Sequence, residues 1–126
     1  MTYVLTLPYQ PMSLNTWMRL HWSAQARHRQ AFQSDVMALL REKGNVCPRP
    51  LRTPVTLRAV VVATTERRRD GDNLSIPLWK DLQDVLVTCG YLPDDTHDLV
   101  HTESPTVIVG PKEMTIVTIE DGVGPC

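Results

Sequence analysis

The hydrophobic positions along the chain follow two different periods, and they predict a mixture of strands and helices. Residues 2–7 (TYVLTL) alternate and are rich in β-formers, so they predict a short strand. Residues 55–64 (VTLRAVVVAT) predict a second strand, and because both of its faces are apolar it should lie in the middle of a sheet. Shorter strands are expected near residues 99–103 or 106–109, and at residues 113–119.

Apolar residues at helical spacing predict a first long helix over about residues 23–43. Ser23 suits an N-cap and Gly44 suits the position just after a helix end. The expected buried stripe consists of Phe32, Val36, Leu39 and Leu40. The stretch before this helix, residues 11–22 (PMSLNTWMRLHW), predicts an irregular loop.

A second helix is predicted over about residues 76–89. Its apolar stripe consists of Leu74, Leu78, Leu82, Val85, Leu86 and Cys89, and Gly90 should end it. Pro77 is tolerated only in a first turn, so the regular helix should begin near Ser75 or Ile76.

These elements predict an α+β fold with a small mixed β-sheet and two main helices. At 126 residues the chain fits a single compact domain, over residues 1–120, with a frayed C-terminal tail at residues 121–126. The domain is small enough that oligomerisation would help its stability.

Composition excludes several classes of protein. The 42% hydrophobic and 21% charged residues are typical of a soluble globular protein. No apolar run approaches the roughly 18 to 20 residues of a membrane span, and the N-terminus lacks the pattern of a signal peptide. We therefore expect a cytoplasmic protein with no membrane partner. Cys47, Cys89 and Cys126 lie far apart without the CxxC spacing of a zinc site or redox pair.

Charge is divided unevenly along the chain, although the net charge is only −1. Residues 1–69 carry 11 Lys/Arg and three Asp/Glu, a net charge of +8, so residues 70–126 carry −9. Such a division suits a basic docking surface beside an acidic metal site. The alternative is that folding mixes the two halves and the division has no function.

The densest candidate chemistry follows the predicted central strand, where residues 67–72 read Arg-Arg-Arg-Asp-Gly-Asp. The glycine between Asp70 and Asp72 lets both carboxylates face one ion, although solvated Asp-Gly-Asp turns are common. Asn73 adds an amide, and the acidic pair at residues 94–95 adds two carboxylates. Oxygen ligands hold Mg²⁺ and the arginines tolerate a polyanion, so the sequence predicts metal-dependent cleavage of a phosphodiester.

Lys80 is the cation of the second helix. It follows Asn73 by seven residues, about two helical turns, so both should lie on one side of the helix. The alternative is an ion pair with Asp84, one turn later. His97 and His101 could be metal ligands on a helix, but in a strand or loop they are ordinary surface histidines.

These motifs resemble the RusA family of Holliday-junction resolvases, found in phages and bacterial prophages. The resemblance is carried by Arg-Arg-Arg-Asp-Gly-Asp-Asn-Leu, by Lys80-x-x-x-Asp84-x-Leu86 and by Gly90-Tyr91-Leu92-Pro93-Asp94-Asp95. The opening Leu-Pro-Tyr-Gln-Pro-x-Ser-x-Asn and the ending Glu-Met-Thr-Ile-Val-Thr-Ile-Glu are also similar to those of the family. In all, the resemblance covers about residues 3–120.

The resemblance implies a homodimeric, Mg²⁺-dependent endodeoxyribonuclease that resolves Holliday junctions by paired symmetric nicks in DNA recombination and repair. Mn²⁺ is expected to substitute, no organic cofactor is expected, and the place of action would be the cytoplasm of a bacterium or phage-infected host. By position, Asp70, Asp72 and Asp95 match the catalytic metal-binding aspartates, with Asp94 as an alternative ligand, and Lys80 matches the functional lysine.

Lys80 departs from the family pattern in its spacing. In the best-known members the lysine follows the asparagine by about one turn, whereas here Ile76 and Pro77 help to push it to two. Lys80 keeps the family's place only if residues 74–77 form a loop or a loose first turn ahead of the helix.

Several residues are predicted to contact DNA. The set nearest the metal is Arg67, Arg68, Arg69 and Asn73, and a second tier is Arg19, Arg27 and Arg29. Trp17 and Trp22 could wedge into the branch point of a junction, although packing in the core is the commoner role of such residues.

Chain geometry favours a site shared between two subunits. A helix over residues 76–89 runs roughly 21 Å away from Asp72, and the five steps from Gly90 to Asp95 return at most about 17 Å. A two-fold partner with this helix antiparallel would bring Asp95 of the partner subunit to Asp70 and Asp72. Two alternatives remain open: a non-catalytic protein that binds branched DNA or regulates recombination, and a small protein-interaction module.

Overall fold

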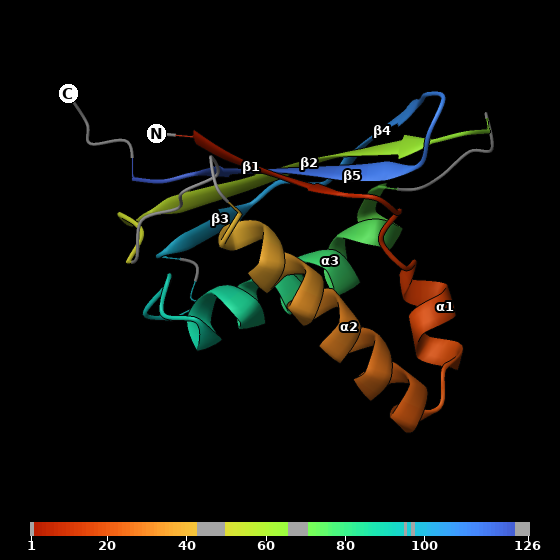
Figure 1. The fold of residues 1–126 in the computed structure, drawn as a ribbon, viewed down its shortest axis with the longest axis horizontal. Coiled ribbons are helices and arrows are strands. Elements are labelled where there is room, and N and C mark those ends of the chain that lie inside the picture. Colours follow the sequence, from red (N-terminus) through yellow and green to blue (C-terminus); the bar gives the residue numbers. More distant parts are fainter. Residues whose placement is uncertain (1, 43–49, 66–70, 95, 97, 123–126) are drawn as a thin grey trace.

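The computed structural model describes residues 2–42, 50–65, 71–94, 96 and 98–122, with side chains left out at residues 71–73. The described part is a small α+β domain with a mixed five-stranded sheet and three helices (Figure 1). In chain order the elements are β1 (Thr2–Leu7), α1 (Leu14–Arg19), α2 (Trp22–Leu40), β2 (Val55–Ala63), α3 (Gly71–Thr88), β3 (Val100–Thr102), β4 (Thr106–Val109) and β5 (Met114–Glu120).

Strand β2 is central, as its two apolar faces predicted. It pairs antiparallel with β5, which in turn pairs antiparallel with β1. Its other edge pairs in parallel with two short strands, β3 beside its first residues and β4 beside its last. Helix α3 lies in the connection from β2 to the parallel β3, and a helix packed on one face of the sheet is the usual form of such a crossover.

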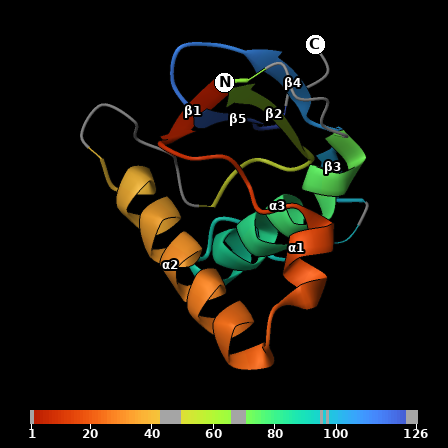
Figure 2. The same cartoon turned by 90° about the vertical axis from the view of Figure 1, so that its right-hand side faces the viewer.

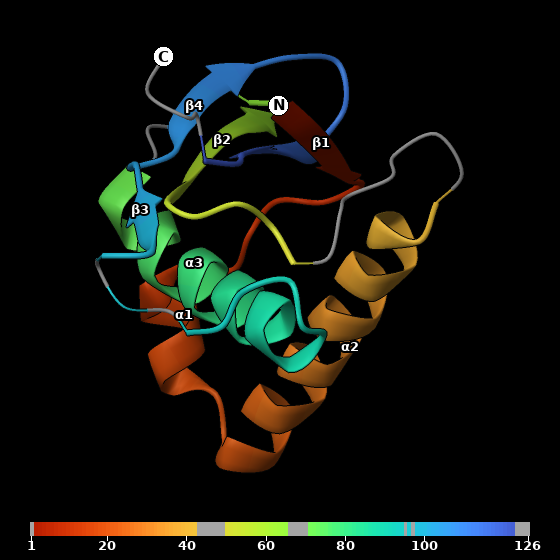
Figure 3. The same cartoon turned by 90° about the vertical axis from the view of Figure 1, so that its left-hand side faces the viewer.

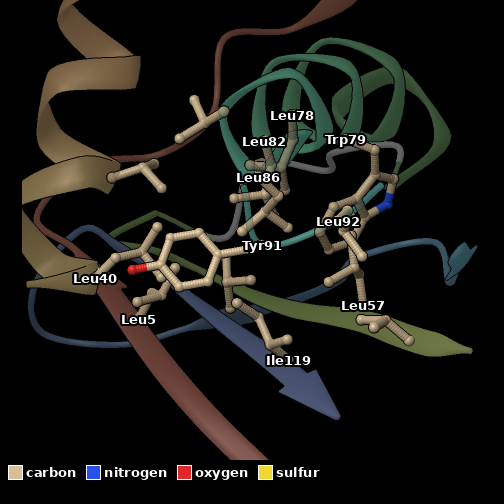
Figure 4. Close-up of a cluster of buried hydrophobic side chains, with 14 of the residues drawn as sticks. Leu5, Leu40, Leu57, Leu78, Trp79, Leu82, Leu86, Tyr91, Leu92 and Ile119 are labelled. Carbon is tan, nitrogen blue, oxygen red and sulfur yellow. The ribbon is translucent and has the colours of Figure 1, made fainter. Parts of the chain in front are cut away.

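The three helices all lie on the same face of the sheet (Figures 1, 2 and 3). The core forms between these layers, and Figure 4 shows Leu57 and Ile119 of the sheet pointing toward Leu82 and Leu86 of α3. All four side chains are fully buried. The alternating strands and the helical stripes of the sequence therefore meet at one apolar interface.

The first half of the helical layer differs from the sequence prediction. Residues 14–19, predicted as a loop, form α1, because the Ser13 hydroxyl caps it by accepting from the Thr16 backbone N–H at 3.2 Å. Helix α2 begins at Trp22 rather than Ser23, and its cap is the His21 side chain, which accepts from the Ser23 N–H. It ends at Leu40, so the predicted end near residue 43 was too late, and the predicted stop at Gly44 lies outside the described residues.

Helix α3 begins at Gly71, five residues before the predicted start, and contains Pro77 in its interior. Proline removes the N–H that would bond to the carbonyl of Asn73. The helix continues because Leu74 and Leu78, on either side of Pro77, are both 2% exposed and anchor it to the core. Its end was predicted correctly, since Gly90 adopts a φ of 83° and the Tyr91 N–H reaches back to the Leu86 carbonyl at 2.8 Å.

The C-terminal segment begins with two packed residues. Asp121 is buried, and the Gly122 N–H donates to the Arg52 carbonyl. The rest of the predicted frayed tail, residues 123–126, lies outside the described part. Within the described residues, none of the helices has both the length and the apolar character needed to cross a membrane.

Candidate metal and nucleic-acid site

The first acidic stretch is placed by the start of α3. Asp72 and Asn73 belong to the first turn of this helix, which follows the C-terminal end of β2. There the Gly110 N–H donates to the Ala63 carbonyl at 2.8 Å, which closes the edge between β2 and β4. Asp70, Arg67, Arg68 and Arg69 lie outside the described residues, so their predicted roles stay predictions.

The second acidic stretch is placed near the opposite end of β2, where that strand begins. Asp94 and Thr96 are exposed, whereas Asp95 and His97 lie outside the described residues. The Thr96 carbonyl accepts from the Val100 N–H at 3.0 Å, and Val100 pairs with Val55, the first residue of β2. Asp94, the described acid of this stretch, therefore belongs to the segment that leads into β3.

The two acidic stretches of one chain are therefore associated with opposite ends of α3. The helix has 18 residues, a length of roughly 27 Å. Its direction is fixed midway, where the Trp79 indole N–H donates to the Glu103 carbonyl at 2.9 Å, and the Glu103 N–H donates to Leu57 of β2. Figure 1 shows α3 running back from the end of β2 toward its beginning. No three His, Cys, Asp or Glu side chains gather into a metal site among the described ones, which do not include those of Asp70, Asp72 and Asp95.

Lys80 is exposed on α3, and the helix is regular around it. Residues 74–77 lie inside α3, which begins at Gly71, so neither the loop nor the loose first turn that would have let Lys80 keep the family's place is formed. Lys80 stays about two turns, or roughly 10 Å, beyond Asn73. Although both residues are described, no ion pair joins it to Asp84, and the position one turn after Asn73 is filled by Ile76, which is 57% exposed.

The second tier of predicted DNA-binding arginines divides into two kinds. Arg19 and Arg27 are exposed on α1 and α2. Arg29 is half-buried and instead contacts other elements, with its Nε 3.5 Å from the Asp81 carboxylate and its guanidinium 5.4 Å from the centroid of the Trp17 ring. Arg29 thus joins α1, α2 and α3, and Arg19 and Arg27 remain available to an outside anion.

Asp81 is a charged residue that the sequence prediction missed. Its side chain is 5% exposed and lines a small pocket together with His28, Gln10 and Pro77. The signal was present in the sequence, because Asp81 falls on the apolar stripe of α3 between Leu78 and Val85. Burial raises the pKa of its carboxyl, and the nearby Arg29 and His28 lower it by a smaller amount.

The raised pKa of Asp81 predicts a specific pH dependence of stability. A carboxyl that holds its proton more tightly in the folded state lowers the free energy of unfolding as the pH rises from the ordinary pKa, about 3.9, through the raised one. We expect the free energy of unfolding of the wild type, minus that of Asp81→Asn, to decrease over this window. Urea unfolding of both proteins at a series of pH values measures the difference, and a difference that increases with pH contradicts the prediction.

Comparison with known proteins adds no relative: no protein-family model matches the chain, and no curated protein matches it. Any functional assignment therefore rests on the residues of the chain and their placement.

Proposed function

We propose that the chain is a RusA-type, Mg²⁺-dependent endodeoxyribonuclease that works as a homodimer. It resolves four-way DNA junctions by paired symmetric nicks during recombination and repair. The observation that carries the proposal is the position of Gly71, Asp72 and Asn73, which form the first turn of α3, the helix that follows the central strand β2 in the chain. Ends of strands that feed a helix are common positions for catalytic groups, because a rigid scaffold holds them at a solvent-facing edge.

The chemistry of the donor set fits Mg²⁺, since Asp70, Asp72 and Asp95 all offer hard carboxylate oxygens. The geometry supports a shared site, because one chain associates its two acidic stretches with opposite ends of α3. A two-fold partner whose α3 runs antiparallel supplies the missing carboxylate to each site. These carboxylates would hold Mg²⁺, and the bound ion would supply Lewis-acid chemistry toward a water and the scissile phosphate.

The residues around the ion have separate roles in this proposal. Asp70 and Asp72, with Asp95 of the partner subunit, would hold the ion. Arg67, Arg68 and Arg69 bind the phosphates next to the cut, where positive charge strengthens binding to any sequence. Lys80, farther along α3, binds the phosphate whose negative charge increases during the reaction.

The test is a panel of DNA substrates incubated with the full-length protein. We expect nicks at symmetric positions in a mobile four-way junction in Mg²⁺ or Mn²⁺, and none in EDTA. Linear duplex of the same sequence should stay intact. Salt-dependent binding of the junction without nicking in any divalent metal would support the non-catalytic alternative, and no preference for branched DNA would overturn both.

The position of Lys80 leads to a prediction that uses Ile76. Lys80→Ala should slow nicking by roughly 10- to 100-fold, because a positive charge at the reacting phosphate is lost. Adding Ile76→Lys returns a lysine one turn earlier, at an exposed position, and should recover part of the rate. Single-turnover nicking rates of wild type, Lys80→Ala and the double variant measure both effects. Ile76→Leu in the Lys80→Ala background is the matched control, and equal rates in the two double variants would refute a positional role for the lysine.

A further inference from the structure

The corner between α1 and α2 combines exposed apolar side chains with positive charge. Trp22 is 73% exposed and Met18 is 69% exposed. Arg19 and His21 lie between them in the sequence and are also exposed, and the rings of His21 and Trp22 are 5.4 Å apart. Figures 1, 2 and 3 show this corner as the end of the helical layer farthest from the sheet. We name the set Met18, Arg19, His21 and Trp22 the helical tip.

The helical tip is held rigidly from behind. The Gln25 amide donates to the Trp17 carbonyl at 2.8 Å, which ties α2 to α1. The Trp17 ring meets the His28 ring edge-on at 5.7 Å and lies under the Arg29 guanidinium. Arg29 in turn reaches the buried Asp81 of α3. The internal role of Trp17 therefore leaves Trp22 as the tryptophan of this pair that faces solvent.

The charged residues near the helical tip along the chain are all positive. The first 34 residues contain no Asp or Glu, whereas Arg19 and Arg27 project from α1 and α2. Asp81, which Arg29 contacts from behind Trp17, is buried and forms an ion pair with Arg29. An exposed indole between arginines suits a nucleic acid, because the arginines bind phosphates and the flat ring stacks on a base.

We propose that the helical tip binds the branch point of DNA, with the Trp22 indole stacked on a base that is unpaired or at the end of an arm. The inference rests on the proposed function, because it takes a branched DNA as the partner and adds the surface that recognises the branch. A continuous duplex offers no free base face, so stacking by Trp22 favours a junction over linear DNA. Arg19 and Arg27 contribute affinity for both.

An anionic membrane is the other partner that a basic tip with a tryptophan could suit. The outward positions near the tip favour DNA: Asn15, Thr16, Arg27 and Gln30 are exposed and polar, and Met18 and Trp22 are the large exposed apolar residues among the described residues of α1 and α2. Two such side chains give a small apolar area for insertion into lipid, whereas one ring is sufficient to stack on one base.

The test measures binding without cutting, in EDTA, using a four-way junction with 2-aminopurine at the branch point and a matched linear duplex. Trp22→Ala should weaken junction binding about 10- to 100-fold, leave duplex binding within about 2-fold, and remove the 2-aminopurine fluorescence change. Trp22→Phe, which keeps an aromatic face, should retain most of both signals. Ile108→Ala, on β4 and 47% exposed in the wild type, is the control for losing an exposed apolar side chain.

Each other result overturns the inference. Unchanged junction binding by Trp22→Ala, or an equal loss on junction and duplex, removes the stacking role. Loss of binding to phosphatidylserine vesicles by Trp22→Ala, with junction binding intact, would assign the tip to a membrane. A wild type that binds junctions through Trp22 but never nicks them in Mg²⁺ would contradict the proposed nuclease activity and leave the role of Trp22 in place. Melting curves of all variants confirm that they are folded.

Discussion

Replacing Asp72 by asparagine is expected to abolish junction nicking while leaving junction binding intact. The amide keeps the shape of the side chain but removes a negative charge that would hold Mg²⁺. The rate should fall by roughly 100- to 1000-fold or more, which is the scale of losing one group that stabilises a transition state by charge. Affinity should stay the same or improve, because a carboxylate that repels DNA phosphates is gone.

Nicking rates in Mg²⁺ and junction affinities in EDTA, measured on the same protein preparation, check the two halves of this expectation. Glu42→Gln makes the same kind of change at an exposed position after α2 and serves as the control. Asp72→Asn protein that nicks at the wild-type rate would remove the metal site from the start of α3. Equal losses of binding and nicking would indicate a structural role for Asp72.

Mixing two inactive variants is expected to restore cutting, if each site draws on two subunits. Asp70→Asn lacks a ligand at the start of α3, and Asp95→Asn lacks the ligand beyond its end. In a mixed dimer, one of the two shared sites combines two damaged contributions and the other combines two intact ones. Random exchange makes about half of the dimers mixed, so about one quarter of the wild-type sites should return.

The pattern of products makes this experiment sharper than the rate alone. A mixed dimer has a single working site, so it should nick one strand of a junction and leave the paired cut unmade. The control mixes each variant with itself after the same subunit-exchange treatment. A mixture as inactive as its components, with subunit exchange confirmed by differently tagged chains, would place all three carboxylates in one subunit.

The sheet and the core could be predicted from the sequence because they depend on periodicity. The run at residues 55–64 has two apolar faces, and it forms the central strand β2 with partners on both edges. The apolar stripe before Gly90 forms the buried side of α3. The helix stop at Gly90 could also be predicted, because a glycine with positive φ ends a helix through local sequence alone. Both signals are contained within a few neighbouring residues.

The sequence prediction differs from the structure where contacts between distant residues determine the helix bounds or the exposure of a side chain. Helix α1 has only six residues and no fully buried side chain, so the sequence contains no apolar stripe that would predict it. The helix depends on the Ser13 cap. The early start of α3 depends on Leu74 and Leu78 meeting the core, which overcomes the cost of Pro77. Trp17 is turned inward by its contacts with His28 and Arg29, whereas Trp22 is exposed, and local sequence does not indicate which of the two tryptophans makes such contacts.

In the proposed dimer, the length of α3 sets the distance between the two catalytic centres. Each subunit would place one catalytic centre near the first turn of its own helix and complete the other near the last turn. Two antiparallel helices of 18 residues then separate the centres by roughly 25 Å, somewhat more than the width of a DNA duplex. That spacing determines which phosphodiesters on opposing arms are broken, so inserting one helical turn into α3 should move both incisions outward together.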